Sequence, residues 1–329
     1  MNKTYSAFAR LAIKCCRTIS SAGSQSELML ADVALEQPNI NNSSDVFSCV
    51  GSNEPLPAIT GTVEDVDGDL PEQRCGQLFS LLLSTYTDLY LEEFQCTLLL
   101  CPVRSKKLLY DQVPDNFGKV LWAHSVEEAL DLFDDQILNL KPGSLIQWVS
   151  IDSLLDFKKY RLQNGDLATE RNPEGRILSE GASSLGFIVQ SDECENNVAK
   201  YSFEPFSNVA ATEVTETIAK MLENTVPSFV ISNRSTNDAQ QISEWYRVFG
   251  APKQGLNHLS TRQSLGDTGL NEFGVVLALS WALAKYIQSD SSSPCLVFYG
   301  YYRLYLPSLV IARQPKKDSY SHIYGMQYE

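Results

Sequence analysis

Hydrophobic residues recur at helical spacing between residues 125 and 140. The apolar positions on one face are Val126, Ala129, Leu130, Phe133, Ile137 and Leu140. Ser125-Val-Glu-Glu128 in front of them has the form of a capping box, with a hydroxyl followed three residues later by Glu. Pro142-Gly143 ends the pattern. These features predict a capped amphipathic helix with one face in the core.

Apolar runs of strand length follow this helix and also precede it. Residues 144–151 and 182–189 are almost continuously apolar or small, which is typical of strands covered on both faces. Residues 95–101 form a third run, which stops at Pro102.

The second half of the chain repeats the alternation of strands and helices. We predict strands at 201–206 and 228–232, a helix at 214–222, a buried helix at 273–287, and a hairpin of 295–299 with 305–312. This alternation predicts an α/β fold with layered packing.

The first ninety residues are less regular. Residues 5–18 fit an amphipathic helix, and residues 75–91 also have helical spacing. Residues 20–69, rich in Ser, Asn, Asp, Pro and Gly, read as loops with short strands. The chain after Gln314 is a polar tail.

Composition narrows the classes of partner. The chain has 329 residues, 26 of them Lys or Arg and 40 Asp or Glu, for a net charge of −14, which argues against nucleic acid. Lys106-Lys107 reads as a short solvated pair. Apolar runs fall short of the roughly 20 residues that span a bilayer, so we expect no membrane association. Arg10 and Lys14 interrupt the apolar stretch that a secretory signal needs, which favours the cytoplasm.

Metal and cofactor motifs are not found in the sequence. The eight cysteines form no C-x-x-C pair, and there are three histidines, so zinc spacing is absent and we expect no metal. The glycines lack a phosphate-binding fingerprint, and we expect no cofactor. The cysteines read as buried or idle thiols.

Two glycine-containing segments resemble loops of a known protein family. Asn172-Pro-Glu-Gly-Arg-Ile-Leu-Ser-Glu-Gly-Ala-Ser-Ser-Leu-Gly186 and Ser264-Leu-Gly-Asp-Thr-Gly269 resemble landmark loops of the beta-ketoacyl synthases of the thiolase superfamily. The resemblance implies a thiolase-like layered fold of two mixed-sheet halves around central helices. The halves would span residues 1–195 and 196–313, with a polar tail at 314–329. Active synthases open with a Gly-rich strand, whereas this chain is predicted to begin at the helix after it.

The resemblance also assigns three catalytic positions. The synthase nucleophile, a Cys at a helix start, falls on or beside His124, and the two synthase histidines fall on Asn233 and Asp267. A synthase forms its acyl-thioester on a thiol, and a carboxylate does not donate a hydrogen bond unless its pKa is raised. The three departures together predict that the catalytic set is lost.

Each singled-out residue also has a plainer interpretation. His124 is either a remnant base or a surface or packing residue, and Asp267 either a general base or a turn residue that caps a helix from Asn271. Glu180 reads as a buried, hydrogen-bonded structural carboxylate. The three glycines read as turn glycines are Gly181, Gly266 and Gly269. The aromatic residues between 298 and 305 either form a binding surface or alternate between core and dimer contacts.

Two functions remain open at this point. The first is a non-catalytic, homodimeric scaffold or adaptor, dimerised through its first half, that binds a protein partner or acyl carrier protein. The alternative is an active acyltransferase or condensing enzyme of the 3-oxoacyl-ACP synthase type. The enzyme requires His124, Asn233 and Asp267 to converge in one pocket, whereas the scaffold predicts that Trp122 or Phe273 fills it.

Overall fold

The computed structural model describes residues 5–25, 42–48, 55–87, 92–157, 167–169, 172, 175–191, 201–205, 220, 229–233, 257–286, 295–301 and 304–312.

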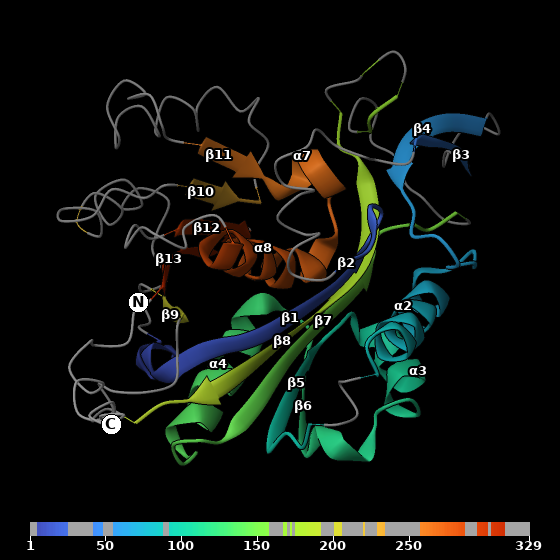
Figure 1. The fold of residues 1–329 in the computed structure, drawn as a ribbon. Helices are drawn as coiled ribbons and strands as arrows, with labels where there is room; N and C mark the ends of the chain where they lie inside the picture. Colours follow the sequence, from blue (N-terminus) through green and yellow to red (C-terminus); the bar gives the residue numbers. More distant parts are fainter. Residues whose placement is uncertain are drawn as a thin grey trace, which may run out of the picture.

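The first half of the chain forms a mixed sheet (Figure 1). Its strands, in spatial order, are β6 (Lys119–Ala123), β5 (Cys96–Leu100), β7 (Leu145–Ser153), β8 (Leu178–Val189) and β1 (Leu11–Ser20). The strand β5 is parallel to both β6 and β7, while β8 is antiparallel to both β7 and β1.

The second half repeats this arrangement. Its strands, in spatial order, are β11 (Asn257–Ser260), β10 (Phe229–Ser232), β12 (Cys295–Tyr301), β13 (Leu304–Ala312) and β9 (Tyr201–Pro205). Here β10 is parallel to β11 and β12, and β13 is antiparallel to β12 and β9. The two halves are joined by an antiparallel contact of β1 with β9 at Ala12 and Ser202. The structure is therefore two similar mixed-sheet units that share one continuous sheet.

Helices cover both faces of the first-half sheet (Figure 1). On one face lie α2 (Pro71–Thr85) and the short α3 (Lys106–Tyr110), which share an apolar cluster with β5 and β7. On the other face, α4 (Val126–Leu138) and α8 (Glu272–Tyr286) share a larger cluster with β1, β5, β7 and β8. Because α8 also contacts β10, β12 and β13, it lies between the two halves. The α/β fold with layered packing and a central helix is confirmed.

The remaining described elements are short. They are η1 (Ser6–Arg10), β2 (Gly23–Gln25), β3 (Asn42–Ser48), β4 (Pro55–Gly61), η3 (Val103–Ser105), η4 (Asp115–Phe117), α7 (Thr261–Leu265) and η5 (Gly269–Asn271). β3 pairs with β4, and the end of β4 runs parallel to the start of β8.

The predicted helix at residues 5–18 is wrong. Residues 6–10 form the 3-10 helix η1, and residues 11–20 form β1, which is paired along its length with β8. Side chains on both faces of β1 are buried, with Cys16 in the cluster that contains α8 and Ile19 in the cluster that contains α2. An opening strand is thus present, contrary to the expectation that the chain begins at the following helix.

Most other elements match their predictions. The strands at β5, β7, β9 and β10, the hairpin of β12 with β13, and the helices α4 and α8 are confirmed. β8 begins at Leu178, earlier than predicted, and α2 begins at Pro71. The sequence did not predict β6 or β11. The predicted helix at 214–222, except Lys220, the boundary near 195 and the tail after 314 lie outside the described residues.

Candidate functional site

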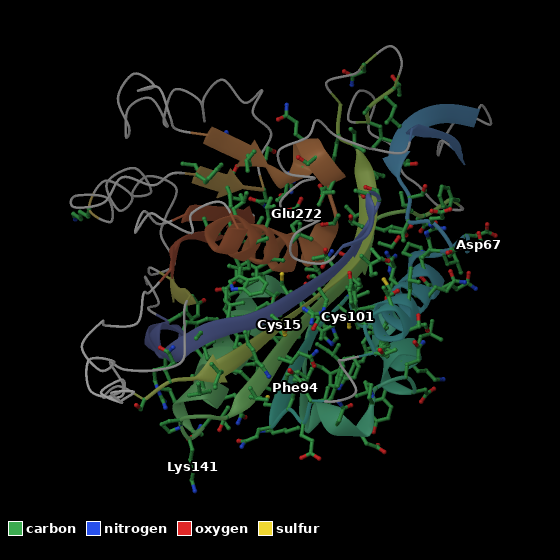
Figure 2. The ribbon with its side chains drawn as sticks, viewed as in Figure 1. Cys15, Asp67, Phe94, Cys101, Lys141 and Glu272 are labelled. Atoms are coloured by element: carbon green, nitrogen blue, oxygen red, sulfur yellow. The ribbon has the colours of Figure 1, made fainter. Side chains whose placement is uncertain are left out.

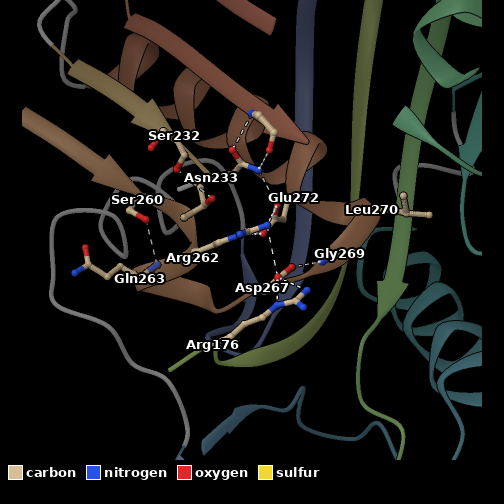
Figure 3. A network of polar contacts seen from close by, with 12 residues as sticks. Arg176, Ser232, Asn233, Ser260, Arg262, Gln263, Asp267, Gly269, Leu270 and Glu272 are labelled. Carbon is tan, nitrogen blue, oxygen red and sulfur yellow. Dashed lines mark hydrogen bonds and ion pairs between the residues drawn. The ribbon is translucent and has the colours of Figure 1, made fainter. Parts of the chain in front are cut away.

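A buried polar cluster lies where the second-half strands end and α8 begins (Figure 3). Asn233 directly follows β10, Arg262 lies on α7, Asp267 lies between α7 and η5, and Glu272 is the first residue of α8. Asn233, Asp267 and Glu272 are almost fully buried. Because β10 is parallel to both of its neighbours, their carboxyl ends meet at this edge, which gathers residues distant in sequence.

The side chain of Asn233 is fully engaged in structural hydrogen bonds. Its Nδ2 donates to Glu272 Oε2 at 2.8 Å and to the Gly300 carbonyl at 2.9 Å, and its Oδ1 accepts from the Gly300 N–H at 3.0 Å. Both donors and the carbonyl oxygen are therefore used to hold α8 and the end of β12 in place.

Glu272 is held by a guanidinium as well as by Asn233. Arg262 Nε lies 2.5 Å from Glu272 Oε1, and Arg262 Nη2 lies 3.0 Å from Glu272 Oε2. Burial raises the pKa of Glu272 to about 8, with a further upward contribution from the Asp267 carboxylate, whereas the hydrogen bonds from Arg262 and Asn233 oppose the rise.

Asp267 is an ion-paired turn residue. Arg176 and Arg262 both pair with Oδ2, the second at 3.5 Å, and Oδ1 accepts from the Gly269 N–H at 3.1 Å. Burial alone would raise its pKa, but the two arginines and the hydrogen bonds hold the pKa of Asp267 below its ordinary value. Asp267 is therefore an ionised acceptor at neutral pH, without a proton to donate to a carbonyl.

The interpretation of the glycine loops is confirmed in part. Gly266 and Gly269 have φ values of +76° and +60°, as turn glycines do. Gly181 instead lies inside β8, where a Cβ would approach the Ile19 carbonyl oxygen to 2.7 Å and Asn271 Nδ2 to 2.8 Å. Its role is close packing, so its prediction as a turn glycine is wrong.

His124 lies at the start of α4 in the first half. Its Nδ1 is 2.8 Å from the Cys101 carbonyl oxygen, and its backbone N–H donates to Glu128 Oε2 at 2.8 Å. Ser125 Oγ accepts from the Glu128 N–H at 3.1 Å. The capping box is thus present, although the glutamate returns to the residue before the cap. The helix start where the resemblance would place the nucleophile is occupied by capping contacts.

The structure brings Asn233 and Asp267 together through Arg262 and Glu272, and it gives His124 contacts of its own at the other half. Phe273 is buried beside the cluster, with its ring 5.0 Å from Trp148 and 5.2 Å from Tyr299. Trp122 belongs instead to the cluster on the opposite face of the first-half sheet, near Tyr110.

Burial disfavours thiolate formation at four of the described cysteines, and two of these, Cys15 and Cys101, are labelled in Figure 2. The described free thiols are Cys15, Cys16, Cys75, Cys96 and Cys101. Burial raises the pKa of Cys15 and of Cys96 to about 11 and that of Cys101 to about 12, and it raises the pKa of Cys75 further still. These four thiols are therefore protonated, poor nucleophiles at neutral pH.

Several charged residues that complete the polar framework were not found from the sequence. Arg74 pairs with Glu180 across 106 residues, and Arg176 reaches Asp267 across 91. Lone arginines in loops and helices carry no local signal for such long-range pairing. The described residues contain no group of three His, Cys, Asp or Glu side chains placed to hold a metal ion. Nor is any described helix both long enough and apolar enough to cross a membrane.

Neither protein-family models nor curated protein sequences match this chain. Solved structures do match. The ketosynthase from module 1 of the bacillaene synthase of Bacillus amyloliquefaciens aligns with 94% of this chain and 77% of its own, at 10% identity and a TM-score of 0.57. The acyltransferase ChlB3 aligns with 93% and 98%, at 11% identity and a TM-score of 0.53.

Another match is a cysteine-to-serine variant of OleA from Xanthomonas campestris, solved with bound lauric acid and lauroyl-CoA. It aligns with 93% of this chain and 100% of its own, at 8% identity and a TM-score of 0.52. Identities this low establish shared architecture alone. The repeated strand order, the central α8 and these matches together show that the chain has the thiolase-like fold of the ketosynthases.

Proposed function

We propose that this protein is a non-catalytic, ketosynthase-like binding or scaffold protein. The observation that carries the proposal is that protein contacts occupy the polar side-chain groups of Asn233 and Asp267, the two positions matched to the synthase histidines. Asn233 holds Glu272 and Gly300, and Asp267 holds two arginines and a tight turn. Such saturated contacts hold a fold together but leave no free donor for a substrate carbonyl.

The start of α4 supports the same proposal. A helix N-terminus is a favourable place for a nucleophile because its free N–H groups stabilise negative charge. Here Ser125 Oγ and the Glu128 carboxylate already accept from backbone N–H groups. The thiol of Cys101, the nearest upstream in sequence, has a pKa of about 12. An acyl-thioester at this position therefore lacks an activated sulfur.

Homodimerisation through the first half is part of the proposal, with a protein partner or acyl carrier protein as the bound molecule. Support for the dimer comes from β6, the outermost strand of the described first-half sheet. Such a strand presents unpaired backbone groups to a second chain.

Intact-protein mass spectrometry tests the absence of acyl transfer. The folded protein is incubated with acyl-CoA and with acyl carrier protein thioesters, and its mass is compared with that of untreated protein. We expect an unchanged mass, because burial raises the pKa of the four thiols Cys15, Cys75, Cys96 and Cys101, and because the side chains of Asn233 and Asp267 are engaged.

Two variants make the result specific. A stable adduct that disappears in His124→Ala would contradict the proposal and place acyl chemistry at α4. An adduct that persists in His124→Ala but disappears in Cys101→Ala would contradict it as well and identify the thiol. Circular dichroism confirms that each variant is folded.

A further inference from the structure

An exposed apolar surface is concentrated on one short segment. Among the described residues, four large hydrophobic side chains are exposed, and three of them lie within residues 103–110: Val103 at 69%, Leu108 at 43% and Tyr110 at 66%. The fourth, Leu138, lies at the end of α4. Scattered exposed hydrophobic residues are ordinary, but a cluster of three on a single turn-and-helix segment marks a contact surface.

The same segment carries positive charge. Arg104, Lys106 and Lys107 all lie between Val103 and Tyr110, a stretch with no Asp or Glu, in a chain whose net charge is −14. All three cationic side chains are exposed. We call this surface the α3 patch and define it by Val103, Arg104, Lys106, Lys107, Leu108 and Tyr110.

Helical spacing places four of these six side chains on one side of the segment. Ser105 and Leu109, four residues apart, are buried and anchor η3 and α3 to the protein. Val103, Lys106, Lys107 and Tyr110 follow at spacings of three or four and face outward. Trp122 of β6 forms the base: the Lys106 ammonium lies 5.5 Å from its ring centroid, and the Tyr110 ring centroid lies 6.2 Å away. Figure 1 shows α3 beside α2, on the face away from α4 and α8.

We propose that the α3 patch docks an acidic, amphipathic segment of a partner protein. The exposed Val103, Leu108 and Tyr110 supply the apolar contact, and the exposed Lys106 and Lys107 pair with carboxylates around it. Arg104 lies 3.9 Å from Glu72 of the same chain and is a weaker contributor. This inference rests on the proposed binding role and adds to it the surface and the chemical class of the partner.

Charge complementarity selects a compact acidic segment over larger anionic surfaces. A bilayer or a nucleic acid extends well beyond the patch and meets a molecule that is strongly negative overall. A peptide segment is different, because salt screens charges more than about 10 Å away. The segment therefore experiences mainly the three cations of the patch and the two neighbouring carboxylates, Glu72 and Asp111, among which the cations are in excess.

Fluorescence anisotropy tests the proposal on the full chain. The probe is a fluorescein-labelled helical peptide with leucines on one face and glutamates on the other. A matched peptide has glutamine in place of every glutamate. We expect the acidic peptide to bind and the glutamine peptide to bind markedly more weakly, with the difference shrinking as salt rises from about 0.05 M to about 0.5 M.

Matched variants locate the binding surface. Lys107→Glu and Lys141→Glu change the net charge equally, and both lysines are exposed, but only Lys107 belongs to the patch. Tyr110→Ser and Leu138→Ser each remove an exposed hydrophobic side chain. We expect Lys107→Glu and Tyr110→Ser each to weaken binding about five- to tenfold. Lys141→Glu and Leu138→Ser should leave binding unchanged.

Several results would overturn the inference. One is failure of the acidic peptide to bind; another is equal effects of the patch variants and their controls. Patch-dependent binding to phosphatidylserine vesicles without peptide binding would assign the surface to lipid. A mass change of the protein in Lys107→Glu, measured by light scattering, would assign it to a second copy. The mass-spectrometry test detects acyl transfer, whereas the anisotropy test detects peptide binding at the α3 patch. A failure of the proposed function can therefore be told apart from a failure of this docking surface.

Discussion

At the scale of single residues, a buried ion pair joins α2 to β8. Arg74 Nε donates to Glu180 Oε2 at 2.6 Å, and both side chains are almost inaccessible to solvent. Glu180 also accepts from the Val63 N–H at 2.9 Å and from Ser153 Oγ at 3.0 Å. The structural interpretation of Glu180 is thereby confirmed. Its partner could not be predicted, because Arg74 has ordinary helical surroundings in sequence and pairs through the fold.

Removing the Arg74 side chain should strongly destabilise the folded protein. We expect Arg74→Met to lower the free energy of unfolding by about 3–5 kcal/mol, because it leaves the Glu180 carboxylate buried without its counterion. Urea denaturation measures the change. Lys14→Met is the control, since Lys14 pairs with Glu92 at the surface, where such pairs contribute about 0–1 kcal/mol. Equal losses in the two variants would contradict this account of the pair.

At the scale of elements, periodicity succeeded where one face is clearly apolar. The segment that became α4 has both a cap and an apolar face, and α8 is an apolar run of helix length. The prediction for the segment that forms β1 was wrong because Leu11, Cys15 and Thr18 fit helical spacing as well as they fit a strand. Pairing with β8 and burial on both faces decide in favour of a strand, and neither is visible in local sequence.

The close contact of α8 with the first-half sheet depends on a glycine that the sequence did not single out. A Cβ at Gly274 would lie 2.0 Å from Ser183 Oγ and 2.3 Å from Ser150 Oγ. Those hydroxyls lie 2.8 Å apart, and Asn271 Oδ1 lies 3.0 Å from the Ser150 hydroxyl and 2.7 Å from that of Ser183. The missing side chain at Gly274 lets the helix backbone approach this polar contact between the halves.

The edge strand β6 gives a prediction about dimerisation. The Lys119 N–H bonds to the Gln95 carbonyl on the β5 side, so the N–H of Val120, one residue on, points away from β5. Val120→Pro removes that outward donor without removing a bond to β5. If two chains pair through β6, we expect Val120→Pro to be monomeric by light scattering, and Val120→Thr to remain dimeric. A Val120→Pro protein that keeps the dimer mass would exclude β6 pairing.

At the scale of the whole molecule, the chain is a structural repeat without a repeated sequence. Both halves have the same strand order and the same strand directions, but the strands of the two halves have different sequences. The sequence therefore predicted the layered class, and the resemblance predicted the two halves. The polar contacts that couple the halves join residues far apart in sequence, so they are set by the final geometry.

Asp152 is one such coupling. Its Oδ2 accepts from the Leu270 N–H at 2.9 Å, which ties the end of β7 to the 3-10 helix η5 before α8. Its Oδ1 accepts from the Ser153 N–H at 2.8 Å. Burial raises the pKa of this carboxyl to about 6 from an ordinary 3.8, although both hydrogen bonds oppose the rise.

This raised pKa predicts a pH dependence of folding. Between about pH 4 and pH 6 the folded chain keeps a proton on Asp152 that the unfolded chain has lost, so this group's contribution to stability falls as pH rises. A shift of about two pH units corresponds to about 3 kcal/mol. Asp152→Asn has no such proton. We therefore expect the unfolding free energy of the wild type, minus that of Asp152→Asn, to fall by up to about 3 kcal/mol from pH 4 to pH 7.

Urea denaturation across this pH range measures the difference, with Asp135→Asn as a control because Asp135 is an exposed carboxylate on α4. The wild-type minus Asp135→Asn difference should vary little. A flat or rising difference for Asp152→Asn would mean that the fold stabilises the ionised Asp152. The hydrogen bonds from Leu270 and Ser153 would then outweigh burial, and the junction between the halves would be strongest at neutral pH rather than in mild acid.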